Sequence, residues 1–321
     1  CPSVARIPGL GKLGRMMEQR HSVTVGSITL PNPVMTASGT AGHGTELAGY
    51  FDLEELGAVV VKSLSVEPWP GNPSPRVHGT SSGMINSVGL QNPGIESWIE
   101  DDLPALLSHG ARVVVSIWGR SIDEYREAAT RLAGVEGITA VEVNVSCPNL
   151  ESRGDMFAHD PNSCEAAISA SLISGLPTWA KLSPNVTDIV SIAKAAMGAG
   201  AEALTLTNTL FGMVINPQTL RPVLGNGGGG LSGPSIRPVA VRAVYDVYQS
   251  LGPVPIIGVG GITKAEHAVE FLAAGASAVQ VGSAHFADPK ASLRVLRGLQ
   301  KWCRKHEITS LRSIIGAAHE S

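Results

Sequence analysis

The chain alternates short apolar runs with longer amphipathic stretches. Eight runs of three to six residues are dominated by Val, Ile, Leu, Ala or Trp, and turn-forming residues follow most of them. Continuous apolar runs of this length predict strands that are buried on both faces. The predicted strands cover residues 34–37, 58–61, 112–115, 140–143, 178–180, 203–206, 254–259 and 278–281.

Apolar residues recur at helical spacing between most of these runs. The predicted helices cover residues 122–133, 161–174, 188–197, 238–249, 264–274 and 289–305. Strands that alternate with helices in this way form a parallel sheet covered by helices. Eight units favour an α/β fold of the (β/α)8 TIM barrel type, as a single domain over residues 1–321. An open, doubly wound sheet is the alternative.

Two intervals between predicted strands are longer than the others. About fifty residues separate the second strand from the third, and about forty-five separate the sixth from the seventh. Both contain segments rich in Gly, Pro, Asn and Ser, at residues 68–75 and 216–233. Because these inserts follow strands 2 and 6, we expect long loops at the carboxyl-terminal face, where barrel enzymes have their active sites.

Polar side chains and glycines collect where the predicted strands end. Two lysines occupy such positions although only 16% of the residues are charged. The carboxyl ends of barrel strands converge, so these groups are expected to share one site; a lysine that only extends into water is the alternative. The residues are Ser38, Gly39, Lys62, Ser63, Ser116, Asn144, Lys181, Asn208, Thr209, Gly260, Gly261, Gly282 and Ser283.

The last two strands end in glycine turns that predict a phosphate site. Residues 258–263 read Gly-Val-Gly-Gly-Ile-Thr and residues 281–284 read Val-Gly-Ser-Ala, each before a predicted helix. Glycine lets backbone N–H groups approach an anion closely. Tight turns without a ligand are the alternative. The G-x-G-x-x-G pattern at 225–230 has no strand before it, and we expect a flexible loop there. The G-x-S-x-G pattern at 79–83 lies inside the first insert.

Composition and charge exclude several classes of protein. A hydrophobic content of 43% excludes a disordered chain, and a net charge of −3 gives no basic surface for nucleic acid or an anionic membrane. The sequence has no apolar run of membrane-spanning length and no signal-peptide core, so we expect a cytoplasmic protein. Nine histidines and four cysteines form no recognisable metal-binding spacing, so no metal site is expected.

The fourth predicted strand leads into Asn144-Val-Ser-Cys-Pro-Asn149. Asparagine amides both donate and accept hydrogen bonds, which suits an amide-bearing ring, and the thiol of Cys147 can transfer a proton. Cys164 and Cys303 lie in predicted helices, where we expect buried, inert thiols.

Together, these segments resemble the class 1 dihydroorotate dehydrogenases, flavoproteins of pyrimidine biosynthesis with a (β/α)8 fold. The resemblance extends from about residue 25 to residue 289 and includes Asn86-Ser-Val-Gly-Leu-Gln-Asn-Pro-Gly94. Class 1 has Cys at the position of Cys147, whereas class 2 has Ser and an additional membrane domain. The sequence Gly-Leu-Gln-Asn-Pro-Gly at 89–94 resembles the 1B subtype. Further matching segments are residues 32–40, 62–63, 144–149, 181–185, 208–209, 230–234 and 258–261.

The resemblance implies FMN-dependent oxidation of (S)-dihydroorotate to orotate, with Cys147 as the base and hydride transfer to N5 of the flavin. It implies that FMN is bound by Ser38, Lys62, Ser63, Asn144, Lys181, Thr207, Gly233, Gly260, Gly261, Gly282 and Ser283. It implies that the pyrimidine is bound by Lys62, Asn86, Ser87, Val88, Gly89, Leu90, Asn144, Asn208 and Thr209.

The resemblance also implies partners. Class 1B catalytic subunits form homodimers within heterotetramers, in which a subunit with FAD and a [2Fe–2S] cluster passes electrons to NAD⁺. This chain departs from the family at Ser116, where Asn is common, at Thr207, where Ile is common, and at Ser283, where Thr is common. Two other functions remain open: reduction of uracil or thymine, as in dihydropyrimidine dehydrogenase, and a non-catalytic barrel that binds a partner.

Overall fold

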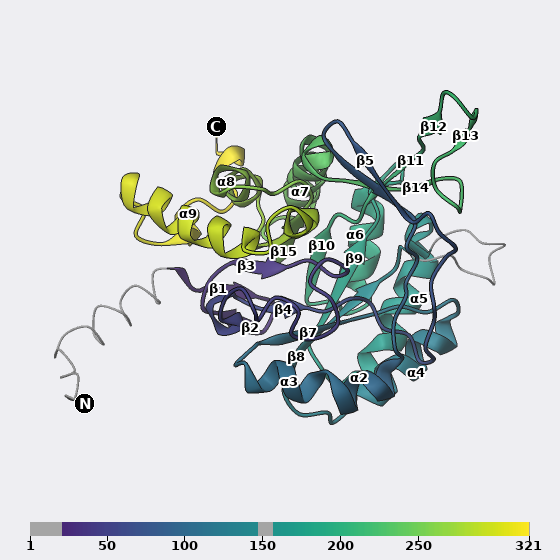
Figure 1. Ribbon diagram of the computed structural model, residues 1–321. Helices are drawn as coiled ribbons and strands as arrows, with labels where there is room; N and C mark the ends of the chain where they lie inside the picture. Colours follow the sequence, from purple (N-terminus) through teal and green to yellow (C-terminus); the bar gives the residue numbers. More distant parts are fainter. Residues whose placement is uncertain (1–20, 147–156, 321) are drawn as a thin grey trace, which may run out of the picture.

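Eight parallel strands form a ring at the centre of the molecule (Figure 1). The computed structural model describes residues 21–146 and 157–320. An isolated bridge between Met35 and Ala58 joins the first and last strands of the sheet, so the ring closes and the predicted (β/α)8 fold is confirmed. The ring order is β3 (Val34–Thr36), β16 (Ala278–Val281), β15 (Ile256–Val259), β10 (Ala203–Leu206), β9 (Thr178–Leu182), β8 (Ile138–Asn144), β7 (Val113–Ile117) and β4 (Val59–Val60).

The joint between β3 and β4 uses a side chain in place of part of the backbone ladder. The Thr36 hydroxyl accepts a hydrogen bond from the Val60 N–H at 2.8 Å and donates one to the Val60 carbonyl at 3.2 Å. The Gly57 N–H also donates to the Val34 carbonyl at 2.8 Å. A buried threonine therefore satisfies backbone groups where the ladder is shortest.

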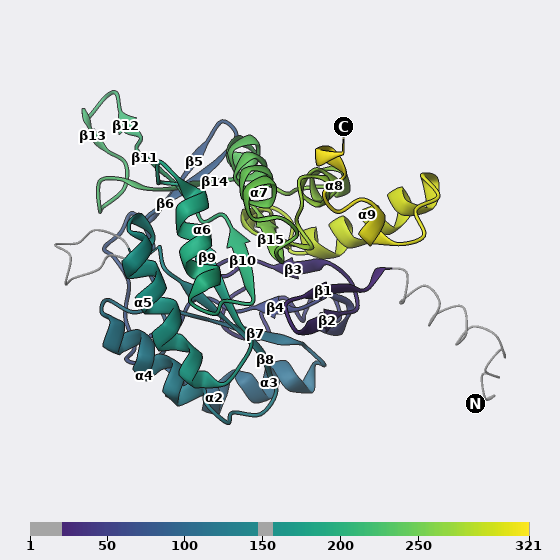
Figure 2. The same cartoon turned by 180° about the vertical axis from the view of Figure 1, so that it is seen from behind.

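The predicted helices are confirmed and surround the ring (Figures 1 and 2). Three of them begin at a residue whose side chain accepts a backbone N–H, namely Ser121, Asp160 and Asp188. The 3-10 helix η3 (Leu172–Ser174) completes the stretch predicted at 161–174. The helices are α4 (Ile122–Leu132), α5 (Pro161–Ser171), α6 (Ile189–Gly198), α7 (Arg237–Leu251), α8 (Ala265–Ala273) and α9 (Ala291–Lys305).

The sequence analysis missed several shorter elements. Two helices, α2 (Ile95–Asp101) and α3 (Leu103–Ser108), follow each other directly, and neither is long enough to show a clear helical period. A hairpin of β1 (Val23–Val25) and β2 (Ile28–Leu30) precedes the ring. Within residues 21–146 and 157–320, no helix combines the length and apolar composition needed to cross a membrane.

The two long intervals contain strands, although we expected loops. A hairpin of β5 (Val77–Thr80) and β6 (Gly83–Asn86) pairs with β14 (Gly229–Ser232), which in turn pairs with β11 (Leu210–Gly212). The four strands form an antiparallel sheet near the carboxyl ends of the ring strands (Figure 1). A second hairpin, β12 (Ile215–Asn216) and β13 (Arg221–Pro222), projects from the body. The loop expected at 225–230 is therefore wrong from Gly229 onward, because two glycines of β14 concealed its strand pattern.

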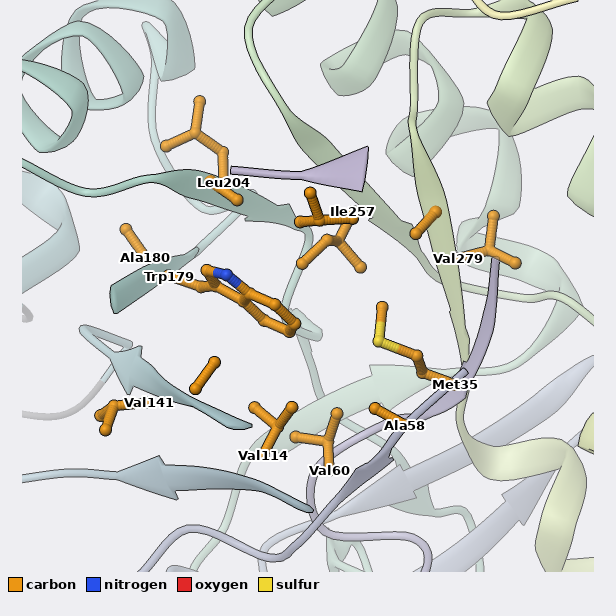
Figure 3. Packing of buried hydrophobic residues seen from close by; sticks show 14 of the residues in the cluster. Met35, Ala58, Val60, Val114, Val141, Trp179, Ala180, Leu204, Ile257 and Val279 are labelled. Atoms are coloured by element: carbon orange, nitrogen blue, oxygen red, sulfur yellow. The ribbon is translucent and has the colours of Figure 1, made fainter. Parts of the chain in front are cut away.

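The inside of the ring is apolar in one layer and polar in the next. Figure 3 shows the indole of Trp179 in the middle of the apolar layer, among Val60, Val114 and Ile257. Side chains two residues apart on a strand point to the same face. Lys181, two residues after Trp179, therefore enters the ring above the indole.

Candidate active site

A cavity of about 1090 Å³ lies at the carboxyl ends of the ring strands, beside the four-stranded sheet. It brings together every predicted cofactor and substrate residue that the structure describes. Cys147 lies outside the described residues. The predicted residues that line the cavity are Ser38, Lys62, Ser63, Asn86, Ser87, Val88, Gly89, Leu90, Asn144, Lys181, Thr207, Asn208, Thr209, Gly233, Gly260, Gly261, Gly282 and Ser283.

Lys181 forms the floor of the cavity within a buried polar network. Its ammonium group donates to the Ser38 hydroxyl at 2.9 Å and forms a buried ion pair with Glu142 at 3.2 Å. Gln280 donates to the other Glu142 oxygen at 2.7 Å, and Thr205 donates to the same oxygen at 3.1 Å. Because every member has a partner, the network holds the Lys181 cation at a fixed position.

Asn144 connects two walls of the cavity. Its side-chain amide donates to the Ser63 hydroxyl at 3.3 Å, and its side-chain carbonyl accepts from Asn208 at 3.2 Å. Ser63 also shares a hydrogen bond of 2.8 Å with Ser116. Ser116 is buried within β7 and does not line the cavity. Ser116 therefore places a hydroxyl that supports Ser63 from behind.

The segment from Asn86 to Leu90 forms a third wall beside Lys62. The Lys62 ammonium group donates to the Gly89 carbonyl at 3.5 Å, and Asn86 donates to the Gly230 carbonyl at 3.3 Å. Gly89 has φ +74°, a left-handed conformation that favours glycine. This wall therefore combines one cation with amide groups and backbone carbonyls.

The glycine turns supply backbone donors at the far end of the cavity. Gly260 and Gly261 follow β15 with φ values of +137° and +70°, and a Cβ on Gly261 would lie 2.8 Å from the Gly233 carbonyl oxygen. Within the part of the chain that the structure describes, the N–H groups of Gly260, Gly261 and Ser283 donate to no other group. Such an array suits an anion such as a phosphate.

The sequence analysis missed cavity residues from the first insert and from the turn after β7. Trp69, Trp118 and Arg120 line the same cavity, and the Arg120 guanidinium lies over both indole rings. It also missed Glu142 and Gln280, which hold Lys181. A charged residue inside an otherwise apolar strand was the available signal for Glu142, because such a residue is buried only with a partner.

The two described cysteines are structural. Cys164 and Cys303 are buried, as expected, and burial raises the pKa of Cys164 to about 12 and raises the pKa of Cys303. A thiol with a raised pKa is a poor nucleophile. The described residues contain no cluster of His, Cys, Asp or Glu suited to a metal ion.

Comparison with known proteins relates the chain to one family. The sequence model of the dihydroorotate dehydrogenase family matches residues 20–302. The chain is 50% identical over 311 residues to the "Dihydroorotate dehydrogenase B (NAD(+)), catalytic subunit" of Desulforudis audaxviator, covering 95% of this chain and 99% of the relative. It is 48% identical over 303 residues to the protein of the same name from Geobacter sp. strain M21, covering 94% and 99%. The chain therefore belongs to the dihydroorotate dehydrogenase family.

Proposed function

We propose that this protein oxidises (S)-dihydroorotate to orotate in pyrimidine biosynthesis, as a single FMN-binding barrel domain. The observation that carries the proposal is that all described residues predicted for cofactor and substrate line one cavity. The names of its relatives, which match over nearly their whole length, support the same reaction.

The described residues fit FMN. We assign the phosphate to the cradle formed by Gly260, Gly261, Gly282 and Ser283. A side chain on Gly261 would collide with the Gly233 carbonyl, so this turn requires glycine. Ser38, Lys62, Ser63, Asn144 and Lys181 offer the polar groups that the isoalloxazine edge and ribityl chain require. When bound there, FMN supplies a hydride acceptor at N5 for the hydrogen on C6 of the substrate.

The remaining residues bind the substrate and move its proton. Amides of Asn86, Asn144 and Asn208 can pair with the ring N–H and C=O groups, and the Lys62 ammonium group can pair with the carboxylate. We assign removal of the C5 proton to the Cys147 thiolate. Cys147 lies outside the described residues, and its neighbour Ser146 lines the cavity.

We propose that the electrons leave through a second protein. The relatives are named as catalytic subunits of NAD⁺-linked enzymes. A homodimer of this chain within a heterotetramer, whose other subunit carries FAD and a [2Fe–2S] cluster, would pass electrons to NAD⁺. Copurification with that subunit, and NADH formation that requires it, test this part of the proposal.

Anaerobic reduction of the purified holoenzyme tests the reaction itself. Dihydroorotate should bleach the flavin absorbance, and the cofactor released on denaturation should be FMN. Cys147→Ala should keep the flavin but lose most of the reduction rate, about 10²-fold or more, whereas a variant with the wild-type rate would remove Cys147 as the base. Reoxidation of the reduced flavin by uracil but not by orotate would favour the dihydropyrimidine dehydrogenase type. A colourless protein would favour the non-catalytic barrel.

A further inference from the structure

Arg120 is held at the wall of the cavity by two tryptophans. Its guanidinium carbon lies 4.7 Å from the ring centroid of Trp118 and 5.3 Å from that of Trp69. The two indoles lie 5.5 Å apart at an interplanar angle of 50°. A guanidinium that stacks on aromatic faces keeps the N–H donors on its edge available for an anion.

The Arg120 charge has no carboxylate partner among the described residues. The nearest acid in its turn, Glu124, accepts the backbone N–H of Arg120 at 2.8 Å and forms no ion pair with the guanidinium. The described lining of the cavity contains Lys62, Arg120 and Lys181 but no Asp or Glu. Because Glu142 balances the charge of Lys181 at the floor, the positive charge of the described lining lies on the side of Lys62 and Arg120.

Packing connects Arg120 to the proposed substrate wall. The Trp69 ring lies against Gly89, where a Cβ would be only 2.9 Å from the indole. Trp69 and Asn92 also exchange backbone hydrogen bonds of 3.0 Å. Since the Gly89 carbonyl accepts from Lys62, the order along this wall is Arg120, Trp69, Gly89 and Lys62. Arg120 is half-buried, whereas the floor lysine Lys181 is buried, so Arg120 lies nearer to solvent.

We propose that Arg120 is a specificity-determining cation at the rim of the cavity, which attracts the substrate carboxylate and directs it to Lys62. The inference rests on the proposed function, because the anion is the carboxylate of dihydroorotate or orotate. A fixed charge at the rim of a low-dielectric cavity accelerates the entry of an oppositely charged ligand. Trp69 and Trp118 are positioning residues that fix the guanidinium. Arg120 should act on substrate entry and not on the chemical step.

The test measures association and chemistry separately in the FMN holoenzyme. Stopped-flow mixing gives the association rate constant of orotate and the limiting rate of flavin reduction by dihydroorotate, at about 20 mM and about 500 mM NaCl. Arg120→Gln should slow orotate association about tenfold at low salt and less than about twofold at high salt. Its limiting reduction rate and its affinity for uracil, which lacks the carboxylate, should match the wild type. Arg120→Lys, which keeps the charge, should recover most of the association rate.

Arg312→Gln is the control, because it removes one exposed positive charge that is not part of the cavity lining and should leave both rates unchanged. Equal association rates for Arg120→Gln and the wild type at low salt would overturn the role of Arg120. A loss in the limiting rate with unchanged association would overturn it as well. A wild-type holoenzyme that dihydroorotate does not reduce would instead overturn the proposed function.

Discussion

Two layers inside the ring differ in character within two residues of β9. Trp179 belongs to the apolar layer and Lys181 to the polar one, and both are buried. Burial of apolar surface stabilises the first layer in any orientation that fills the space. The second layer is stable only if each polar group meets its partner, which Lys181, Glu142 and Gln280 do. The apolar layer therefore supports the ring, and the polar layer fixes a charge at the floor of the cavity.

Removing one charge of the polar layer should have the largest effect. Glu142→Leu leaves the Lys181 ammonium group buried without its anion, and we expect a loss of about 3–5 kcal/mol in the free energy of unfolding, measured in urea. The double variant Glu142→Leu, Lys181→Met removes both charges and should recover most of this loss. If the double variant were as unstable as the single one, shape and not charge would dominate this layer.

Shortening the central side chain of the apolar layer should cost somewhat less. Trp179→Leu leaves a cavity among Val60, Val114 and Ile257, and we expect a loss of about 3 kcal/mol. The half-buried Trp302 in α9 provides the control, since Trp302→Leu should cost less than about 1 kcal/mol. Similar losses for the two variants would show that Trp179 is not needed to fill the ring.

The pH dependence of stability tests a buried polar residue at a third place, just beyond the polar layer. His285 lies in η5 (Ser283–Phe286) directly after β16, and burial lowers its pKa to about 4 from 6.5. The unfolded chain then binds the proton more readily than the folded one. Stability is therefore complete well above pH 6.5 and falls by about 3 kcal/mol as the pH decreases to 4. Urea unfolding at several pH values measures this slope.

The variant His285→Asn serves as the control for the acid experiment, because it removes the titrating ring. Its unfolding free energy should be less dependent on pH between about 4 and 6.5 than that of the wild type. An unchanged slope would assign the acid sensitivity to other groups.

The smallest effect concerns the edge of the polar region, where Gly89 meets Trp69. Gly89→Ala adds a Cβ 2.9 Å from the indole at φ +74°, and we expect a loss of about 1 kcal/mol in stability and about tenfold weaker binding of orotate. Gly134→Ala is matched, since Gly134 has φ +75° and open space where the Cβ would lie. Titration calorimetry with orotate, together with thermal unfolding of both variants, separates the contact with Trp69 from the backbone strain. Equal orotate affinities for Gly89→Ala and Gly134→Ala would show that this contact does not shape the site.

The sequence predicted the ring well because apolar residues dominate each of its strands. It did not predict β14, since Gly229 and Gly230 carry no side chains that could show alternation. The strand-end residues line the cavity as predicted, apart from Ser116, which is buried behind Ser63, and the role of each stays a prediction. The partners of Glu142 could not be predicted, because Lys181 and Gln280 are distant in the sequence and meet only through the ring order. Trp69 and Arg120 escaped notice because an insert and a turn show no period.

The threonine at the joint between β3 and β4 gives the ring one place where it can open locally. Protection of the Val60 amide depends on a hydroxyl and not on a neighbouring strand carbonyl, so we expect its hydrogen exchange to be faster than that of the Val114 amide in β7. The strands on the two sides of this joint lead to Ser38 and Lys62. A brief local opening would separate two walls of the cavity while the other seven strand pairs stay intact. We therefore expect local opening of the barrel to occur on the side where ligands bind.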